Sequence, residues 1–93
     1  MSQNLDNLKT YRAINAPKPI QVGEDLSTRP NVVFVPQPQA VMAITDMWRI
    51  DDEWWRREPI SRMYYDVVLV TGRQIVIYKD LINDSWYQQS YRS

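Results

Sequence analysis

The sequence predicts an all-β protein: a small, strongly bent antiparallel sheet of five or six strands, forming an SH3-like or partly open barrel behind a flexible N-terminal arm. Two observations lead to this prediction. The second half of the chain alternates β-branched and aromatic runs with turns that contain Gly or Asn-Asp, as consecutive antiparallel strands do. The chain has only 93 residues, and a closed sheet would hide most of the strand edges that a short β-rich chain exposes.

Residues 1–19 are predicted to form the flexible arm, and residues 20–93 a single β domain. Asn, Gln, Lys and Pro dominate the first stretch, which ends in Ala16-Pro17-Lys18-Pro19. The next residues, Ile20-Gln21-Val22, alternate apolar and polar side chains and predict a short edge strand. Such a strand could pair with its own copy, so the sequence leaves a homodimer open.

The middle of the chain predicts two further strands. Val32-Val33-Phe34-Val35 is a β-branched and aromatic run, and the prolines that follow it predict a loop or a sheet edge. Residues 40–51 fit helical spacing in part, but strict alternation fits them better and favours a long, bent strand. This alternation predicts one face made of Met42, Ile44, Asp46, Trp48 and Ile50.

Residues 52–63 follow no regular period, and Pro59 disfavours a helix at the residue before it. We expect an irregular loop or a single turn here, with Trp54 or Trp55 lying across the barrel. Adjacent residues of an extended backbone point in opposite directions, so one ring should face inwards and the other outwards. The sequence does not tell which of the two is exposed.

The last thirty residues predict a three-stranded meander. Strands at 64–70 and 74–78 are joined at Thr71-Gly72, and Asn83-Asp84 can turn the chain into a last strand at 85–91. Large apolar side chains should compensate for the thin core of so short a chain. The expected core residues are Val33, Val35, Ile44, Trp48, Val67, Leu69, Ile75, Ile77 and Trp86.

Composition excludes several kinds of chemistry. There is no cysteine and no histidine, which removes disulfides, thiolate catalysis and imidazole-based acid–base or metal chemistry, and no cofactor is expected. Eleven basic and eleven acidic residues balance, so no overall field directs the chain onto nucleic acid. No apolar run approaches the roughly 20 residues that span a bilayer, and no secretory signal is visible. We expect a cytoplasmic protein with no membrane partner.

The carboxylates offer two weak candidates for a reactive site. Asp51-Asp52-Glu53 could gather a divalent cation, but neighbouring residues on a strand point apart and arginines flank the block, so a solvated salt-bridge network is favoured. Glu53 could pair with Glu58 or Asp66 in a hydrolase, which would require one carboxyl with a raised pKa. Nothing in the sequence sets their separation, and the protein is predicted not to be an enzyme.

Aromatic and arginine side chains interleave in the middle of the chain. Core packing with extended arginines, protein docking and stacking on single-stranded nucleic acid all use these residue types. The predicted interaction residues are Trp54, Trp55, Arg56, Arg57, Arg62, Tyr64 and Tyr65.

Two stretches carry a family resemblance. The first is WRIDDEWW at residues 48–55, followed by Pro-Ile-Ser-Arg at 59–62, by Tyr64-Tyr65 and by a Val-rich strand. The second is IYKDL at residues 77–81 with WYQQ at 86–89. Over residues 46–91 this pattern resembles a small bacterial domain of unknown function and the C-terminal tail of ImuB-type proteins, inactive relatives of Y-family DNA polymerases in mutagenic repair.

The resemblance implies a role and no reaction. The C-terminal region of ImuB-type proteins is associated with docking to partners of the translesion machinery, which implies an adaptor surface on this chain. The chain differs from that family because it has no polymerase-like body. We therefore expect a non-enzymatic protein-interaction module, linked to bacterial DNA repair or translesion synthesis and bound to an unidentified protein. The alternative is a small β-barrel that binds single-stranded nucleic acid.

Overall fold

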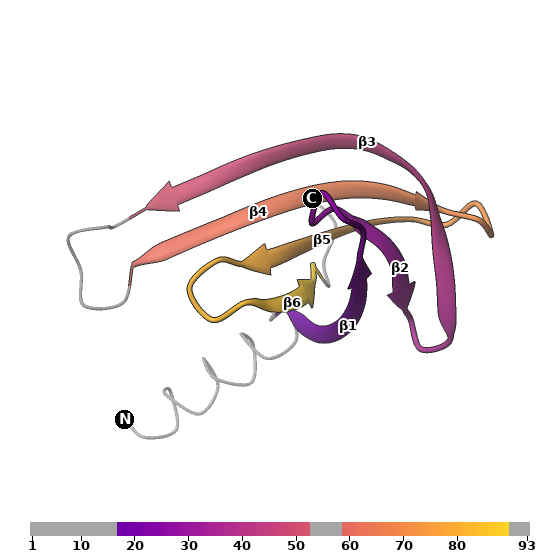
Figure 1. Ribbon diagram of the computed structural model, residues 1–93, viewed down its shortest axis with the longest axis horizontal. Coiled ribbons are helices and arrows are strands. Elements are labelled where there is room, and N and C mark those ends of the chain that lie inside the picture. Colours follow the sequence, from indigo (N-terminus) through magenta and orange to yellow (C-terminus); the bar gives the residue numbers. More distant parts are fainter. Residues whose placement is uncertain (1–16, 53–58, 90–93) are drawn as a thin grey trace, which may run out of the picture.

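The computed structural model describes residues 17–52 and 59–89, and its six antiparallel strands close into a barrel (Figure 1). Each strand pairs with the next along the chain, and the first pairs with the last. The predicted all-β class is therefore confirmed, with a closed rather than a partly open barrel. The strands are β1 (Lys18–Glu24), β2 (Pro30–Phe34), β3 (Pro38–Asp52), β4 (Ile60–Leu69), β5 (Gln74–Asp80) and β6 (Ser85–Gln88).

β1 is not the edge strand that the sequence predicts. Ile20 lies opposite Trp86 of β6 and Val22 opposite Val33 of β2, so the first half of β1 pairs with β6 and the second half with β2, which closes the barrel. The prediction was wrong because β6 comes from the far end of the chain, and local sequence carries no sign of that contact. β1 also begins at Lys18, two residues inside the predicted arm, whose residues 1–16 lie outside the described part of the chain.

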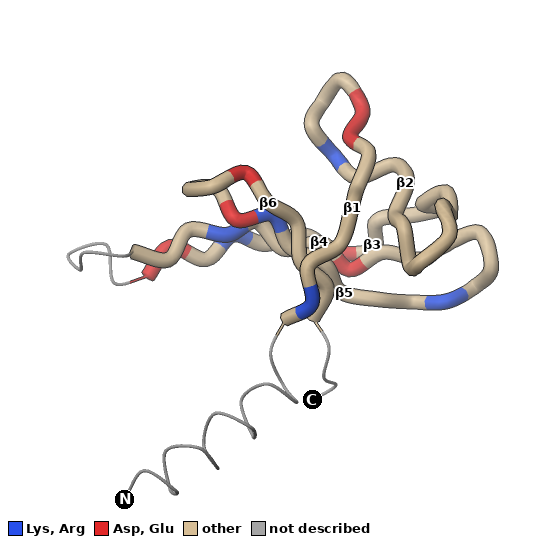
Figure 2. The backbone as a smooth tube through the Cα atoms, turned by 90° about the horizontal axis from the view of Figure 1, so that it is seen from below, with Lys and Arg blue, Asp and Glu red and all other residues tan. Residues whose placement is uncertain are grey.

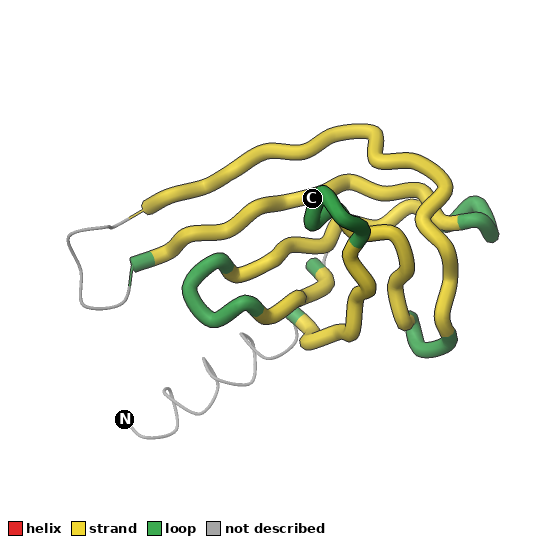
Figure 3. The backbone as a smooth tube through the Cα atoms, viewed as in Figure 1, coloured by secondary structure: helices red, strands yellow, loops and turns green. Residues whose placement is uncertain are grey.

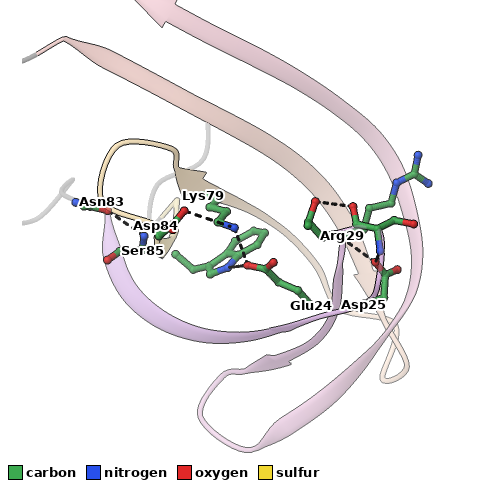
Figure 4. Close-up of polar contacts among 10 residues, drawn as sticks. Glu24, Asp25, Arg29, Lys79, Asn83, Asp84 and Ser85 are labelled. Atoms are coloured by element: carbon green, nitrogen blue, oxygen red, sulfur yellow. Dashed lines mark hydrogen bonds and ion pairs between the residues drawn. The ribbon is translucent and has the colours of Figure 1, made fainter.

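An aspartate holds the turn between β1 and β2. The Asp25 carboxylate accepts hydrogen bonds from the backbone N–H groups of Ser27 at 2.8 Å and Arg29 at 3.0 Å (Figure 4). Short side chains of this type can replace backbone partners in a tight turn. Thr28 completes the turn at a φ of 65°, and β2 begins directly afterwards.

β3 is a strand throughout, which excludes the helical alternative, but two bulges interrupt its alternation. Its register with β4 shifts between Val41 and Ala43 and again between Ile44 and Asp46. Each bulge inserts one extra residue and reverses which face the following side chains occupy. Ile44 therefore packs against the core, whereas Trp48 lies on the outer face and is 38% exposed. The prediction of Trp48 as a core residue was wrong because uninterrupted alternation was assumed.

The C-terminal meander agrees with the sequence. Gly72 has a φ of 90° and Asp84 a φ of 62°, so both predicted turns use left-handed conformations. Figure 3 shows the loops that join the strands in green. β4 begins at Ile60, within the stretch predicted to be irregular, because the backbone of 60–63 continues the ladder with β3. Residues 53–58, including Trp54 and Trp55, lie outside the described part of the chain.

The core fills the barrel interior and comes mainly from the last three strands. Large side chains from facing strands meet there, which is how a small barrel fills its interior. Val35 and Ile44, both predicted core residues, pack against its margin. The buried cluster consists of Val33, Tyr65, Val67, Leu69, Ile75, Ile77 and Trp86.

Candidate functional site

A row of four aromatic rings crosses the outer face of the barrel. Trp48 lies opposite Tyr64, Tyr64 opposite Tyr78 and Tyr78 opposite Tyr87, on β3, β4, β5 and β6 in turn. Successive ring centroids are 5.3, 4.9 and 5.2 Å apart, close to the spacing between neighbouring strands. The sheet register therefore stacks these rings, and we name them the aromatic ladder.

The two inner rings of the aromatic ladder are covered by their neighbours. Tyr64 is 7% exposed and Tyr78 is 3% exposed, although neither belongs to the core cluster. The Trp48 and Tyr64 rings are almost parallel, with 4° between their planes. Since stacking uses the ring faces, the tyrosines in the middle offer no open face to a ligand. Trp48, at the β3 end of the aromatic ladder, is a large ring that remains exposed.

Arg62 closes over the middle of the aromatic ladder. Its guanidinium lies 4.6 Å from the centroid of the Tyr78 ring and donates a hydrogen bond to the Tyr64 hydroxyl at 3.2 Å. A guanidinium at this distance gains cation–π attraction. Burial also raises the pKa of the Tyr78 hydroxyl, so this ring stays neutral under ordinary conditions. Arg62 therefore belongs to the packing of the outer face.

The β3 strand carries a long open edge. β2 pairs with β3 only over Pro38–Ala40, so within the described residues no strand lies on that side from Met42 to Asp51. β3 and β4 continue together beyond the other strands, as the upper pair of ribbons in Figure 1 shows. From Asp46 onwards the register with β4 is uninterrupted. The Met47 N–H donates to Asp46 Oδ1 at 2.9 Å. The edge otherwise has no described strand beside it, and a regular edge of this length is a template for another strand.

Three large apolar side chains stand on this edge. Met47, Trp48 and Ile50 are 40%, 38% and 39% exposed. Alternation places Trp48 and Ile50 on the outer face and Met47 on the opposite face. The open edge is defined below as Asp46–Asp51 of β3, the part with regular register and these side chains.

One ion pair of the predicted salt-bridge network is described, and it lies on the open edge itself. The Arg49 Nε lies 2.7 Å from Asp51 Oδ2, and the Ser61 hydroxyl donates to Asp51 Oδ1 at 2.7 Å. Arg49 and Ser61 lower the pKa of the Asp51 carboxyl, the opposite of what a catalytic acid requires. Within 17–52 and 59–89, no three acidic side chains gather in a way that could hold a metal ion.

The structure separates the predicted interaction residues. Arg62 and Tyr64 lie on the outer face, whereas Tyr65 points into the barrel, where its ring is 5.6 Å from that of Trp86. Tyr65 therefore packs the core and cannot meet a partner, because adjacent strand residues face opposite ways. Trp54, Trp55, Arg56 and Arg57 lie outside the described residues. The residues that sequence reasoning missed are Trp48, Met47 and Ile50, and no local signal indicated their place, because the bulge at Thr45 reverses the faces of β3.

A second polar cluster was also missed, and it joins both ends of the fold. The Glu24 carboxylate accepts a hydrogen bond from the Trp86 indole N–H at 2.9 Å and lies 2.9 Å from Lys79 Nζ (Figure 4). Asp84 is 3.7 Å from the same ammonium. The bonds from Lys79 and then Trp86 lower the pKa of Glu24, and Glu24 raises the pKa of Lys79. This cluster ties β1 to β5 and β6 and explains barrel closure.

Basic residues do not form a stripe on the described part of the chain. Figure 2 shows Lys and Arg positions scattered along the backbone and interspersed with Asp and Glu. The open edge itself carries Asp46 and Asp51 with Arg49. A nucleic-acid surface gathers basic side chains on one face or along one groove.

Comparison with family models, with curated proteins and with solved structures finds no match to this chain. The resemblance to ImuB-type tails therefore stays a prediction. Among the described residues, no helix is long and apolar enough to span a bilayer.

Proposed function

We propose that this protein is a non-enzymatic interaction module that binds an extended strand of a protein partner along the open edge of β3. The observation that carries the proposal is that Asp46–Asp51 has exposed apolar side chains and, within the described residues, no strand on the side away from β4. In strand addition, main-chain hydrogen bonds supply affinity and alternate side chains supply specificity. A cytoplasmic location and the link to bacterial DNA repair, which the sequence predicts, belong to this proposal.

Trp48 supplies the anchor of the proposed site. One face of its ring is stacked on Tyr64, which restricts its rotamers before a partner arrives. A side chain that is already ordered loses less conformational entropy on binding. Tryptophan is also enriched among the residues that dominate interface energies. The aromatic ladder thus acts as a rigid support for one exposed ring.

The same geometry favours a protein partner over single-stranded nucleic acid. Binding of single strands uses several open aromatic faces along a basic groove. In the aromatic ladder, Tyr64 and Tyr78 have their faces covered, and Trp48 shares its face of β3 with Asp46 rather than with a basic groove. Phosphates would be repelled by this carboxylate.

Trp48→Ala is expected to reduce capture of the partner about tenfold or more, since truncating an anchor of this kind costs roughly 2 kcal/mol of binding free energy. The measurement is a pull-down: tagged protein is incubated with nuclease-treated lysate of the source organism, and the partner that it retains is quantified by mass spectrometry. Ile82→Ala is the matched control, because Ile82 is 59% exposed in the turn between β5 and β6, and β4 lies between β5 and the open edge of β3.

The control variant should retain the partner and the Trp48 variant should lose it. Equal retention by both variants would remove the open edge from the proposal. Recovery that disappears with nuclease would favour the nucleic-acid alternative, and its affinity should then fall steeply with salt because phosphate contacts release counterions.

A further inference from the structure

We infer that the strand received by the open edge is the same edge of a second copy, paired antiparallel about a two-fold axis at Trp48. This inference rests on the proposed function and identifies the bound partner as a second copy of the same chain. The first support is that the edge lacks several of the features that keep natural edges apart, although Asp46, Arg49 and Asp51 are charged and the Met47 N–H is bonded to Asp46 Oδ1. Asp46–Asp51 contains no proline, no lysine and no bulge.

Symmetry limits the registers in which two copies can pair. When two edges join into one continuous sheet, residues directly opposite each other lie on the same face. When a strand pairs with its own copy about a two-fold axis, one residue must therefore lie directly opposite the same residue of the second copy, and the axis lies between the two. An axis at Arg49 would set Arg49 against Arg49 of the second copy and Asp46 against Asp52. Like charges directly opposite each other destabilise a sheet.

An axis at Trp48 avoids such pairs. Met47 then lies opposite Arg49 of the second copy, and Asp46 lies opposite Ile50. Arg49 keeps its own partner, Asp51, at 2.7 Å. The regular ladder between the open edge and β4 is undisturbed, because the new strand adds on the other side.

The axis at Trp48 also covers the exposed end of the aromatic ladder. Residues directly opposite each other have Cα atoms about 4.5 to 5.5 Å apart, so the two Trp48 rings would meet across the axis. In each copy the aromatic ladder ends at Trp48, which is stacked on Tyr64 of β4. Pairing would join the two rows into a single one across both copies, and aromatic pairs of this kind stabilise neighbouring strands.

Sedimentation equilibrium over a concentration series tests the association. The wild-type chain is expected to dimerise with rising concentration. Trp48→Lys should weaken the dimer about tenfold or more, because it sets two positive charges opposite each other at the axis. Circular dichroism and thermal unfolding would show whether this variant remains folded.

A mixed disulfide tests the register without altering Trp48. The chain has no cysteine, so any disulfide that forms must join the introduced cysteines. Chains with Met47→Cys, mixed with chains with Arg49→Cys, should cross-link efficiently, because opposite positions fit disulfide geometry. Either chain alone should not, since diagonal positions are about 7 to 8 Å apart. Ile82→Cys mixed with Arg49→Cys measures the background from random collisions.

The outcomes separate the two proposals. A concentration-dependent dimer with the mixed disulfide supports the inference. A monomer at every concentration, or cross-linking no greater than the background, overturns it. If partner capture still depends on Trp48 in that case, the proposed function stands with a different strand on the open edge. If capture is also independent of Trp48, both proposals are overturned.

Discussion

Tyr64→Ala is expected to destabilise the fold by about 3 kcal/mol or more, in the range measured for truncating a buried aromatic side chain. The ring is 7% exposed and lies between Trp48 and Tyr78, so its removal leaves a gap in the middle of the aromatic ladder. The Arg62 guanidinium would also lose the hydroxyl to which it donates. The measurement is urea unfolding of the variant and the wild type.

Tyr64→Phe is the matched control, because it keeps the ring and removes only the hydroxyl. The hydrogen bond from Arg62 is part-buried, and its loss should cost about 0.5 to 1.5 kcal/mol. The two variants together separate ring packing from hydrogen bonding. Equal destabilisation by both would mean that the stacked ring contributes little, and the rigid support for Trp48 would then be absent.

Glu24→Gln is expected to cost about 1 to 3 kcal/mol of unfolding free energy, as loss of hydrogen bonds to a charged group does. The amide preserves the size of the side chain but removes the charge that faces Lys79 and the Trp86 indole. The Lys79 side chain is 17% exposed, and Asp84 at 3.7 Å would be the remaining carboxylate within ion-pair distance. Chemical denaturation at neutral pH measures this loss.

The cost of Glu24→Gln should depend on pH with a defined sign. The folded protein lowers the pKa of Glu24, so the carboxylate stabilises the fold fully above about 4.3, the ordinary glutamate value. That contribution is lost as pH falls through the lowered pKa of the folded state. The stability difference between wild type and variant should therefore shrink in acid. A difference that stays constant from neutral to strongly acidic pH would show that shape rather than charge explains the loss.

Much of the C-terminal half could be predicted from local pattern. Gly72 and Asp84 stand at positions where the backbone turns left-handed, and residue types that tolerate this conformation are few. The apolar residues on either side of the turn at Gly72 alternate with the sheet, so Val67, Leu69, Ile75 and Ile77 were predicted in the core and lie there. These features need only neighbouring residues for their explanation.

The features that local pattern could not predict depend on distant pairing or on bulges. Closure of the barrel brings Ile20 opposite Trp86, and no short segment encodes that contact. The bulge at Thr45 reverses the faces of β3, which moved Trp48 from the predicted core to the outer face. The aromatic ladder follows only once the registers of four strands are known. The predicted residues Arg62 and Tyr64 therefore lie near the proposed site, while its anchor was placed on the wrong face.

The most direct test is amide hydrogen exchange by NMR along β3 and β4. In dilute protein, N–H groups of the open edge that point away from β4 should exchange rapidly, whereas those of β4 from Arg62 to Val68 should be protected by ladders on both sides. At high concentration the same β3 amides should become protected as a second strand adds. Slow exchange along the whole of β3 at every concentration, or rapid exchange along this part of β4, would contradict the open edge on which the proposed function depends.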